Sequence, residues 1–505
     1  MGKINITDTY IINPAYKIRN DKKRCVITNN NSFLLHPKWE INDEISENIS
    51  WTLNPYLEYI FSFFDGKRTL EKILEEFVEI SDLSKEELFK IFSKFIENKE
   101  NQIINISYYY SPIPKRFLIK KTKKIVYRNI LEGIDISTML KDVDMQTMRE
   151  YIPNSIVIMV NNTCVTDCIY CYANTSHKVE KSLSFERIKE IIKEASLLGM
   201  NDVEIGGGDF FVYKHWKKLL PELIKYEYAP YISTKVPITQ EIIDVLKANN
   251  IKGIQLSIDS VDNDEIQKIL NVDEKYLEKV KHGVKLLDDA KIEITIKPVI
   301  TKYNDSIASV TNLLNFLSQF EMVKTINIAP GSYSIYKPFN FSSNVKKIDK
   351  IRELVKSYNT KTSIKINVQG GNTYSDKETR LIAAKGRKSL CSGNVTSFYV
   401  LPDGKVTICE QMYWHPFFIL GDLSKQSIME VWNSEKALNL WNFSQEEVKT
   451  SSPCKTCNEF EKCRRGLGNC WRFAIAAYGE ENYDYPSPDC PYAPEVTKPY
   501  FTPDE

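Results

Sequence analysis

The chain has 505 residues, 42% hydrophobic and 26% charged, which is the composition of a folded globular protein with two to four domains. Its 67 basic and 66 acidic residues leave a net charge of +1, so no global field favours nucleic acid as a partner. Residues 1–20 lack an apolar signal core, and no apolar run approaches the roughly 20 residues that span a bilayer. We therefore expect a cytoplasmic protein that binds neither nucleic acid nor membranes.

The cysteines are the most informative residues of the chain. In a reducing compartment, clustered cysteines indicate metal ligands or catalytic groups rather than disulfides. Of the 11 cysteines, all but Cys25 follow residue 160, and they fall into two groups. We expect Cys25 to be a small buried residue.

Residues 1–105 predict a small winged-helix-like domain. Strand-like runs occupy residues 16–19, 24–28 and 33–35. Thr69 is a favourable N-cap for one amphipathic helix, and Ser84 with Glu87 forms a capping box for the next. The segment offers no catalytic constellation, so its role should be binding or packing.

Residues 106–150 predict a connector. Pro112 and Pro114 would break a helix, and residues 115–124 form a basic run that is more typical of a solvated face than of a site.

Between residues 151 and 385, strand and helix patterns alternate, which predicts an α/β domain with a parallel sheet, doubly wound or curved into a barrel. The expected strands are 156–160, 203–205, 231–233, 254–258, 292–300 and 325–328. The expected helices are 185–198, 214–226, 238–249, 274–289 and 305–319. In barrels the chemistry lies at the C-terminal ends of the strands, and most of the candidate residues below fall there.

The first cysteine group comprises Cys164, Cys168 and Cys171, spaced C-x3-C-x2-C directly after the first expected strand. Three thiolates within eight residues can surround one soft metal centre. A four-iron cluster held by three cysteines keeps one iron free to bind a substrate or cofactor. A zinc site completed by a residue such as His177 is the alternative.

This loop, with Tyr170 before its third cysteine, resembles the radical S-adenosylmethionine (radical SAM) superfamily. The resemblance implies a partial (β/α)6 barrel and a [4Fe–4S] cluster on Cys164, Cys168 and Cys171. It also implies that the cluster binds S-adenosylmethionine and cleaves it to a 5′-deoxyadenosyl radical. The electron would come from a donor such as flavodoxin or ferredoxin.

Further strand ends match cofactor contacts of that family. Gly206, Gly207, Gly208 and Asp209 follow the second strand, where the family has a Gly-Gly-Glu-type motif that touches the methionine amine. Here Asp209 replaces the glutamate, and Phe210 stands where proline is usual. The other implied contacts, with strand-end capping as the alternative for each, are Ser233, Ser257 and Asp259.

The second cysteine group lies in residues 386–505, a loop-rich segment that we expect to have little core and to be held together by bound metal. A hairpin with Asp403–Gly404 at its turn lies between the first two of these cysteines. The group comprises Cys391, Cys409, Cys454, Cys457, Cys463, Cys470 and Cys490.

This pattern resembles the SPASM domain, a C-terminal extension of radical SAM enzymes. The resemblance implies two auxiliary [4Fe–4S] clusters, three clusters in all: one on Cys391, Cys409 and Cys470, the other on Cys454, Cys457, Cys463 and Cys490. The chain departs from the pattern in having six residues, not three, between Cys463 and Cys470. No cysteine follows within residues 392–398, so the first cluster would have an open or non-cysteine position. Structural zinc is the alternative.

The N-terminal domain resembles the recognition element of pathways for ribosomally made, post-translationally modified peptides (RiPPs), through its strand–helix order and the turn at Asp65–Gly66. The resemblance implies that a leader peptide adds as a strand to a sheet edge. A stabilising extension without a ligand is the alternative.

Together these resemblances imply an enzyme that modifies a precursor peptide, foremost by a thioether cross-link from a cysteine sulfur to a peptide carbon, as in sactipeptide- and ranthipeptide-forming relatives. Carbon–carbon or carbon–oxygen cross-linking, a formylglycine-type protein maturase and a zinc-stapled peptide-binding protein are the alternatives. Glu410, directly after Cys409, is a candidate proton acceptor, with an exposed hairpin carboxylate as its simpler interpretation.

Overall fold

The computed structural model of the chain divides into two compact units. The first unit is Met1–Ser155 with Ile192–Val203 and Leu223–Ala229, and the second is Ile156–Ile191, Glu204–Glu222 and Pro230–Glu505. The residues that the structure describes are 4–30, 45–46, 49–106, 109–122, 142–331, 335–337, 341–359, 362–369, 391–464, 470–488 and 490–496.

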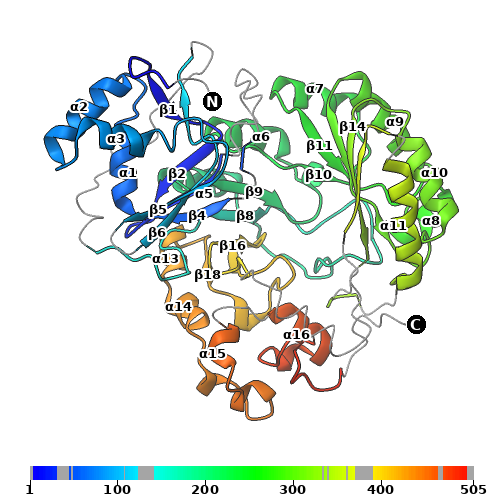
Figure 1. Cartoon of the computed structure of the whole chain (residues 1–505). Helices are drawn as coiled ribbons and strands as arrows, with labels where there is room; N and C mark the ends of the chain where they lie inside the picture. The colour runs from blue at the N-terminus through cyan, green and yellow to red at the C-terminus, as the bar shows by residue number, and fades with distance from the viewer. Residues whose placement is uncertain are drawn as a thin grey trace. The chain divides into compact units, whose positions relative to one another are not determined.

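The described residues of the first unit form small antiparallel sheets and the helices α1, α2 and α3 (Figure 1). Its strands are β1 (Tyr10–Ile12), β2 (Tyr16–Asn20), β3 (Cys25–Asn29), β4 (Ser50–Leu53), β5 (Gln102–Ile106), β6 (Tyr109–Ile113) and β7 (Leu118–Lys120). Strands β2, β3 and β4 form one sheet, β1 pairs with β7, and β5 pairs with β6. The first two predicted strands are confirmed as β2 and β3, whereas the third, at 33–35, lies outside the described residues.

Helices α1 (Pro55–Ser62), α2 (Leu70–Ile80) and α3 (Lys85–Phe92) pack on an aromatic core. Thr69 caps α2, and the capping box of Ser84 and Glu87 begins α3, as predicted. Phe61, near the end of α1, lies 4.6 Å from Phe117 between ring centroids. These described helices, with a small sheet, agree with the winged-helix-like prediction.

The structure differs from the sequence-based domain limits at the predicted connector, 106–150. Strands β6 and β7 are paired, and Phe117 and Leu118 are fully buried in the core of the first unit. Pro112 lies within β6, an arrangement that proline tolerates at a sheet edge. Leu118–Lys120, within the basic run, therefore forms a strand that pairs with β1. The run is not simply a solvated face, because its apolar residues lie in the core.

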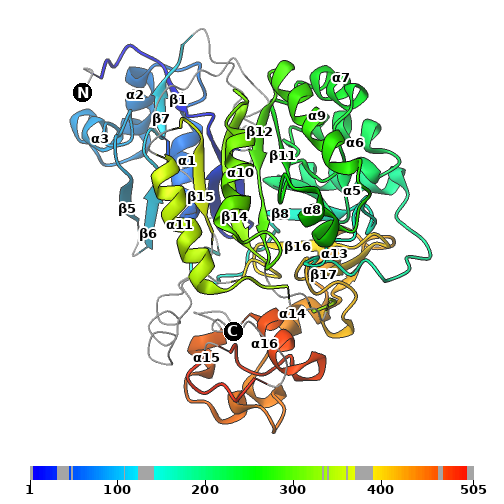
Figure 2. The ribbon, with the colours of Figure 1, turned by 90° about the vertical axis from the view of Figure 1, so that its right-hand side faces the viewer.

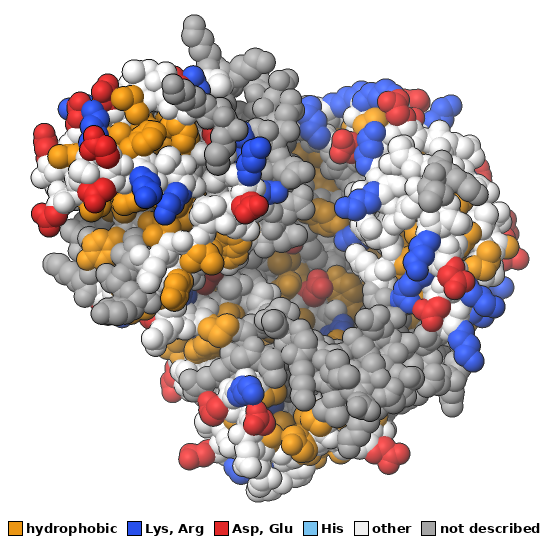
Figure 3. Space-filling model, in the orientation of Figure 1, with side chains coloured by type: hydrophobic (Ala, Val, Ile, Leu, Met, Phe, Trp, Pro, Cys, Tyr) orange, Lys and Arg blue, Asp and Glu red, His pale blue; other side chains and the backbone are white. Residues whose placement is uncertain are grey.

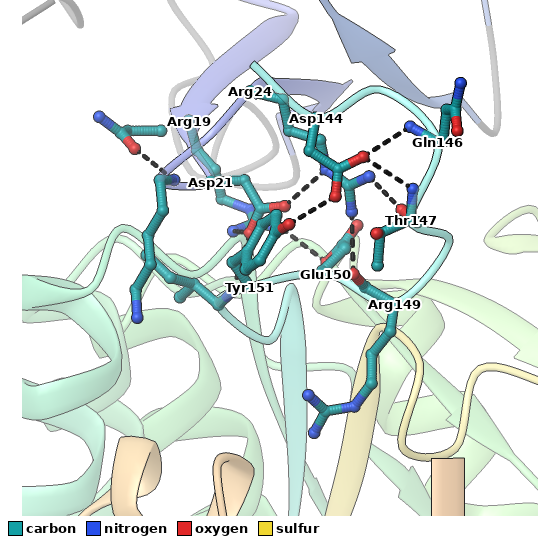
Figure 4. Close-up of polar contacts among 12 residues, drawn as sticks. Arg19, Asp21, Arg24, Asp144, Gln146, Thr147, Arg149, Glu150 and Tyr151 are labelled. Carbon is teal, nitrogen blue, oxygen red and sulfur yellow. Dashed lines mark hydrogen bonds and ion pairs between the residues drawn. The ribbon is translucent and has the colours of Figure 1, made fainter. Parts of the chain in front are cut away.

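The end of the predicted connector is fixed to the turn between β2 and β3 by a buried polar network (Figure 4). The Arg19 guanidinium lies 2.6 Å from the Glu150 carboxylate, and Arg24 lies 2.9 Å from Asp21. Arg24 also donates to the backbone carbonyls of Thr147 and Arg149. Buried charges require such partners, so this network holds residues 142–152 on the turn.

The second unit has a parallel sheet in the order β10-β11-β12-β14-β13, with β15 beside β14. Its strands are β10 (Ser233–Thr234), β11 (Gly253–Leu256), β12 (Glu293–Ile296), β13 (Val299–Ile300), β14 (Val323–Pro330) and β15 (Lys365–Val368). Strands β8 (Ser155–Met159) and β9 (Asp202–Gly206) begin the alternation, in a second sheet. This is the partial α/β barrel that the sequence predicts.

Helices α8, α9, α10 and α11 lie on the outer side of the parallel sheet (Figures 1 and 2). The helices of the alternating region are α5 (Phe185–Leu197), α6 (Trp216–Lys225), α7 (Gln240–Ala248), α8 (Asn263–Leu270), α9 (Tyr276–Asp289), α10 (Ile307–Leu317) and α11 (Val345–Asn359). The sequence analysis missed α8, α11 and β15. Among the helices of the described ranges, none has both the length and the apolar character needed to cross a membrane.

The C-terminal part of the second unit has more core than expected. Its strands β16 (Ser397–Val400) and β17 (Lys405–Thr407) form the predicted hairpin, and β18 (Gly421–Asp422) pairs with β17. Its α-helices are α13 (Ile428–Trp432), α14 (Glu435–Trp441), α15 (Phe460–Lys462) and α16 (Trp471–Tyr478). Trp432 packs on Phe398, and Phe418 packs on Trp471. The expectation of little core was wrong, because a few large aromatic side chains bury much apolar surface.

Candidate active site

The first cysteine group lies on the loop after β8, and backbone hydrogen bonds hold this loop at both ends. Near its start, Gly208 N–H donates to Asn161 O (2.8 Å) and Asp209 N–H to Thr163 O (2.9 Å). Further along, Asp167 N–H donates to Leu270 O (2.9 Å) at the end of α8. The loop is therefore fixed by the segment after β9 and by a helix that the sequence analysis missed.

Two glycines after β9 are required by the close approach of this loop. Gly207 has φ +113°, and a Cβ there would lie 2.1 Å from Asn161 O. A Cβ on Gly208 would lie 2.0 Å from Thr163 O. No side chain fits at these distances, so the glycines bring the loop and the strand end together.

The three thiols of this loop lie close enough to affect one another. Desolvation raises the pKa of Cys164 to about 12, and Asp209, Cys171 and Cys168 act in the same direction. Burial also raises the pKa of Cys171, with a further contribution from Cys168. Neighbouring thiolates repel one another unless a cation is bound between them, so this donor set fits an iron–sulfur cluster.

A single zinc ion is a poorer fit. Zinc needs its sulfur and nitrogen ligands at about 2.0–2.3 Å. Within the described ranges, no three His, Cys, Asp or Glu side chains are grouped closely enough to hold one metal ion. The His177 ring stacks on Trp414, with 3.8 Å between ring centroids. His177 and the three thiols therefore do not form a ready-made zinc site.

The Asp209 carboxylate is buried and occupied by protein donors. It accepts hydrogen bonds from Thr234 Oγ1 (2.8 and 2.9 Å), from Lys235 N–H (2.8 Å) and from Phe211 N–H (3.1 Å). The side chain thus ties the segment after β9 to the end of β10. Only the backbone of residues 206–209 is left to face a bound cofactor.

Asp259, after β11, is also occupied. Its Oδ2 accepts from the Tyr170 hydroxyl (2.6 Å) and from Lys235 Nζ (3.1 Å), and its Oδ1 accepts from Val299 N–H (2.8 Å). Its side chain has no exposed surface. The geometry makes Asp259 a residue that positions Tyr170 and Lys235, and the cofactor contact that the resemblance implies for it stays a prediction.

The two serines differ from these aspartates. Ser233 is exposed on β10, and Ser257, half-buried after β11, accepts from the Gln255 amide (3.1 Å). The same Gln255 amide oxygen accepts from the Tyr231 hydroxyl (2.7 Å). Both serines lie at the C-terminal end of the parallel sheet, where their hydroxyls can meet a ligand.

The C-terminal cysteines influence one another in two sets, and the cluster memberships that the resemblance implies stay a prediction. In the first, burial raises the pKa of Cys391 and of Cys409, that of Cys409 to about 12, and Cys470 contributes to both shifts. In the second, burial raises the pKa of Cys454, Cys463 and Cys490, and Cys457 adds to all three of these shifts. Residues 465–469, within the unusual spacing, lie outside the described residues.

Glu410 links the two cysteine groups. Its carboxylate accepts a hydrogen bond from the Tyr172 hydroxyl (3.2 Å), so the residue after Cys171 contacts the residue after Cys409. Burial raises the pKa of Glu410, and Glu204 adds to the shift, whereas Tyr172, Arg472 and Lys297 oppose it. Glu410 is half-buried and not the exposed hairpin carboxylate of the simpler interpretation.

Sequence reasoning missed Thr234, Lys235 and Tyr172. Lys235 and Thr234 directly follow Ser233, and Tyr172 directly follows Cys171, so each stands beside a residue already selected. The sequence signal that could have identified these three residues is a polar side chain directly beside a predicted strand end or a cysteine.

Comparisons with known proteins identify both cysteine-bearing regions. Residues 158–317 match the family model described as the Radical SAM superfamily, and residues 391–458 match SPASM, an iron–sulfur cluster-binding domain. A GTP 3′,8-cyclase of Clostridium botulinum (strain Okra / Type B1) is 26% identical over 121 residues, which are 23% of this chain and 38% of that protein. The chain thus spans less than half the length of such cyclases. The sporulation killing factor maturation protein SkfB of Bacillus subtilis (strain 168) is 20% identical over 300 residues, 58% of this chain and 68% of that protein.

Among solved structures, Streptococcus suis SuiB bound to the precursor peptide SuiA has a TM-score of 0.62 at 14% identity, over 95% of this chain and 99% of that chain. SuiB bound to S-adenosylmethionine has a TM-score of 0.63 with the same coverage. At such identity the likeness shows the fold. The two family matches assign residues 158–317 to the radical SAM type of domain and residues 391–458 to the SPASM type.

Proposed function

We propose that this enzyme modifies a ribosomally made precursor peptide. The observation that carries the proposal is the hydrogen bond from Tyr172 to Glu410, which joins the loop of the first cysteine group to the Cys391, Cys409 and Cys470 set. A substrate at this junction would meet both the group that starts a radical reaction and a group that can accept an electron.

In this proposal Cys164, Cys168 and Cys171 hold a [4Fe–4S] cluster. When bound, that cluster supplies the electron that cleaves S-adenosylmethionine to a 5′-deoxyadenosyl radical. The backbone of residues 206–209 and the hydroxyls of Ser233 and Ser257 surround the S-adenosylmethionine, while Tyr170 is held in place by Asp259.

The two C-terminal sets hold auxiliary clusters. Arg464, which donates to Asp484 O (3.0 Å) and lies over the Trp471 ring at 4.5 Å, places a positive charge beside Cys454 and Cys463. That charge favours the ionised thiols and thus the binding of iron.

The N-terminal unit binds the leader of the precursor peptide. In the sheet order β2-β3-β4, strands β2 and β4 are the edges among the described strands, and a peptide can add to such an edge by main-chain hydrogen bonds. Apolar side chains of α2 and α3, including Ile80 and Ile91, are exposed between charged ones on this unit (Figure 3). The fold likeness to SuiB bound to a precursor peptide, and the similarity to a maturation protein, support a peptide substrate.

The bond formed is, in this proposal, a thioether. With S-adenosylmethionine and the clusters bound, the site would supply removal of a hydrogen atom from a peptide carbon and of one electron as the carbon–sulfur bond closes. Glu410 would accept the proton of the peptide's cysteine thiol, and Cys391, Cys409 and Cys470 would hold the cluster that accepts the electron. Carbon–carbon or carbon–oxygen cross-linking needs the same radical and the same electron acceptor, and is the second candidate.

The test is tandem mass spectrometry of a precursor peptide encoded near the gene, co-expressed with the enzyme without oxygen. Loss of two hydrogens per site, with a cysteine that no longer reacts with an alkylating agent, is the expected result. The same loss in a precursor whose cysteines are replaced by alanine would exclude the thioether and favour the second candidate.

Two controls isolate the parts of the proposal. Cys164→Ala should leave the precursor unmodified, because the radical cannot form. A precursor with a scrambled leader should be modified at a much lower rate than the native one. Equal rates of modification for the scrambled and native leaders would contradict leader binding, but they would leave the proposed radical chemistry unaffected.

A further inference from the structure

Lys235 places an ammonium group inside the protein beside the first cysteine group. Its side chain is 14% exposed, and its Nζ lies 3.1 Å from Asp259 Oδ2 and 5.5 Å from the centre of the Tyr170 ring. Its own carbonyl accepts a hydrogen bond from the Tyr276 hydroxyl (2.7 Å), which fixes the backbone. The fold does not require a positive charge at this buried position, and the proposed reaction does not use one.

The ammonium is held in its charged form. Burial alone would lower the pKa of Lys235, but Asp259 and the neighbouring thiols Cys168 and Cys164 outweigh burial and raise it. A buried lysine with one carboxylate partner is a fixed positive charge and not a proton donor for the reaction.

This charge lies beside the loop of the first cysteine group. Lys235 Nζ is 5.5 Å from the centre of the Tyr170 ring, and Tyr170 stands between Cys168 and Cys171 in the sequence. Lys337 also has a partner on this loop, but that partner, Asp167, is exposed, so water and salt screen the pair.

The second effect of Lys235 is geometric. Lys235 and Tyr170 share one oxygen of Asp259, and the other oxygen is taken by Val299 N–H. Asp259 and Lys235, from two strand ends, therefore fix the hydroxyl of the residue that directly precedes Cys171.

We infer that Lys235 is a positioning residue of the cluster site, which fixes Tyr170 through Asp259 and raises the reduction potential of the cluster held by Cys164, Cys168 and Cys171. A positive charge stabilises the reduced cluster, because reduction adds one negative charge beside it. The electron comes from the external donor, and Lys235 itself neither gains nor loses an electron or a proton.

The experiment is a mediated redox titration of the anaerobically prepared holoenzyme, followed by electron paramagnetic resonance. The signal that changes when S-adenosylmethionine is added identifies the cluster in question among the others. In Lys235→Met, the ratio of reduced to oxidised cluster at the wild-type midpoint should fall about tenfold, a shift of 59 mV to lower potential for one electron. Lys235→Arg, which keeps the charge, should stay near the wild-type midpoint.

Other variants separate charge from simple disruption. Lys235→Met with Asp259→Asn removes both charges, and its midpoint should return toward that of the wild type. If Lys235→Met does not retain iron, Lys235→Gln takes its place. A midpoint that does not fall in either neutral variant, or that falls equally in Lys235→Arg, overturns the inference.

This inference rests on the cluster in the proposed function, and the two can fail separately. If the wild type has no iron–sulfur signal that responds to S-adenosylmethionine, the proposed function fails. If that signal is present and Lys235→Met leaves its midpoint unchanged, only the role of Lys235 fails.

Discussion

The two cysteine-rich regions of the second unit are built in opposite ways. The first places three cysteines within eight residues, on a loop tied to β9 and α8 by backbone hydrogen bonds. The second spreads seven cysteines over 100 residues, on short helices, single turns and a small hairpin. In the first region the protein fold positions the thiols. In the second, the aromatic core and the bound clusters together must position the chain.

The difference predicts different responses to the loss of a ligand. A region whose backbone is fixed by strands should keep its shape when a thiol is removed. A region with few regular elements should lose local structure with its cluster, because metal binding there contributes folding free energy.

The largest effect is expected for Cys164→Ala. Cleavage of S-adenosylmethionine should fall to background, because two thiols cannot hold the cluster. The circular dichroism spectrum and the melting temperature should stay close to those of the wild-type enzyme. A melting temperature lowered as much as in a C-terminal cysteine variant would contradict the proposed contrast.

Cys457→Ala should disturb the C-terminal region instead. We expect cleavage by a protease within residues 442–496 to become roughly tenfold faster, which corresponds to about 1.4 kcal/mol of local stability. Mass spectrometry of the fragments locates the cuts. Lys455→Ala, two residues away and bonded only to backbone carbonyls among its described contacts, is the matched control and should behave as the wild type.

Glu410 tests the point at which the two regions meet. If its carboxylate accepts the proton, Glu410→Gln should lower the modification rate by roughly 10²–10⁴-fold. Burial raises the pKa of Glu410, so its ionised form is present above that raised pKa and is lost as the pH falls through it. The rate of the wild-type enzyme should therefore fall on the acid side.

Tyr172→Phe sharpens this test. The Tyr172 hydrogen bond lowers the pKa of Glu410, so its removal should move the acid limb of the pH–rate profile to higher pH. A profile of the Tyr172→Phe enzyme that overlays the wild-type profile would show that Glu410 does not set the acid limb.

Gly207→Ala tests the rigid first region by a change of backbone and not of a ligand. Both Gly207 and Gly199 have positive φ, but only at Gly207 would a Cβ meet other atoms. Gly199→Ala should cost about 1 kcal/mol from backbone strain alone. Gly207→Ala should cost about 1–3 kcal/mol more and reduce the iron bound by the first cysteine group, as measured by iron analysis.

The sequence could predict those features that depend on local spacing. The caps at Thr69 and Ser84 and the hairpin after Phe398 follow from neighbours along the chain. Eight-residue α8 was missed because so short a helix carries a weak periodic signal.

The partners of Asp259 could not be predicted in this way. Tyr170, Lys235 and Val299 lie 89, 24 and 40 residues from it along the chain, and only the fold brings them together. The alternation of strands and helices places all of these residues at strand ends, but it does not say which of them touch. Tertiary packing therefore decides whether a carboxylate at a strand end faces a ligand or other protein groups.

The polar network around Arg19 also has a consequence for synthesis on the ribosome. Arg19 and its partner Glu150 are 131 residues apart, and Arg24 donates to a carbonyl 125 residues further on. At about 5–20 residues per second, the partners of these arginines emerge roughly 7–26 seconds later. The packing of the β2–β3 turn on residues 142–152 therefore cannot be completed until residue 150 of the 505 has emerged, and the turn stays accessible to a chaperone in that interval.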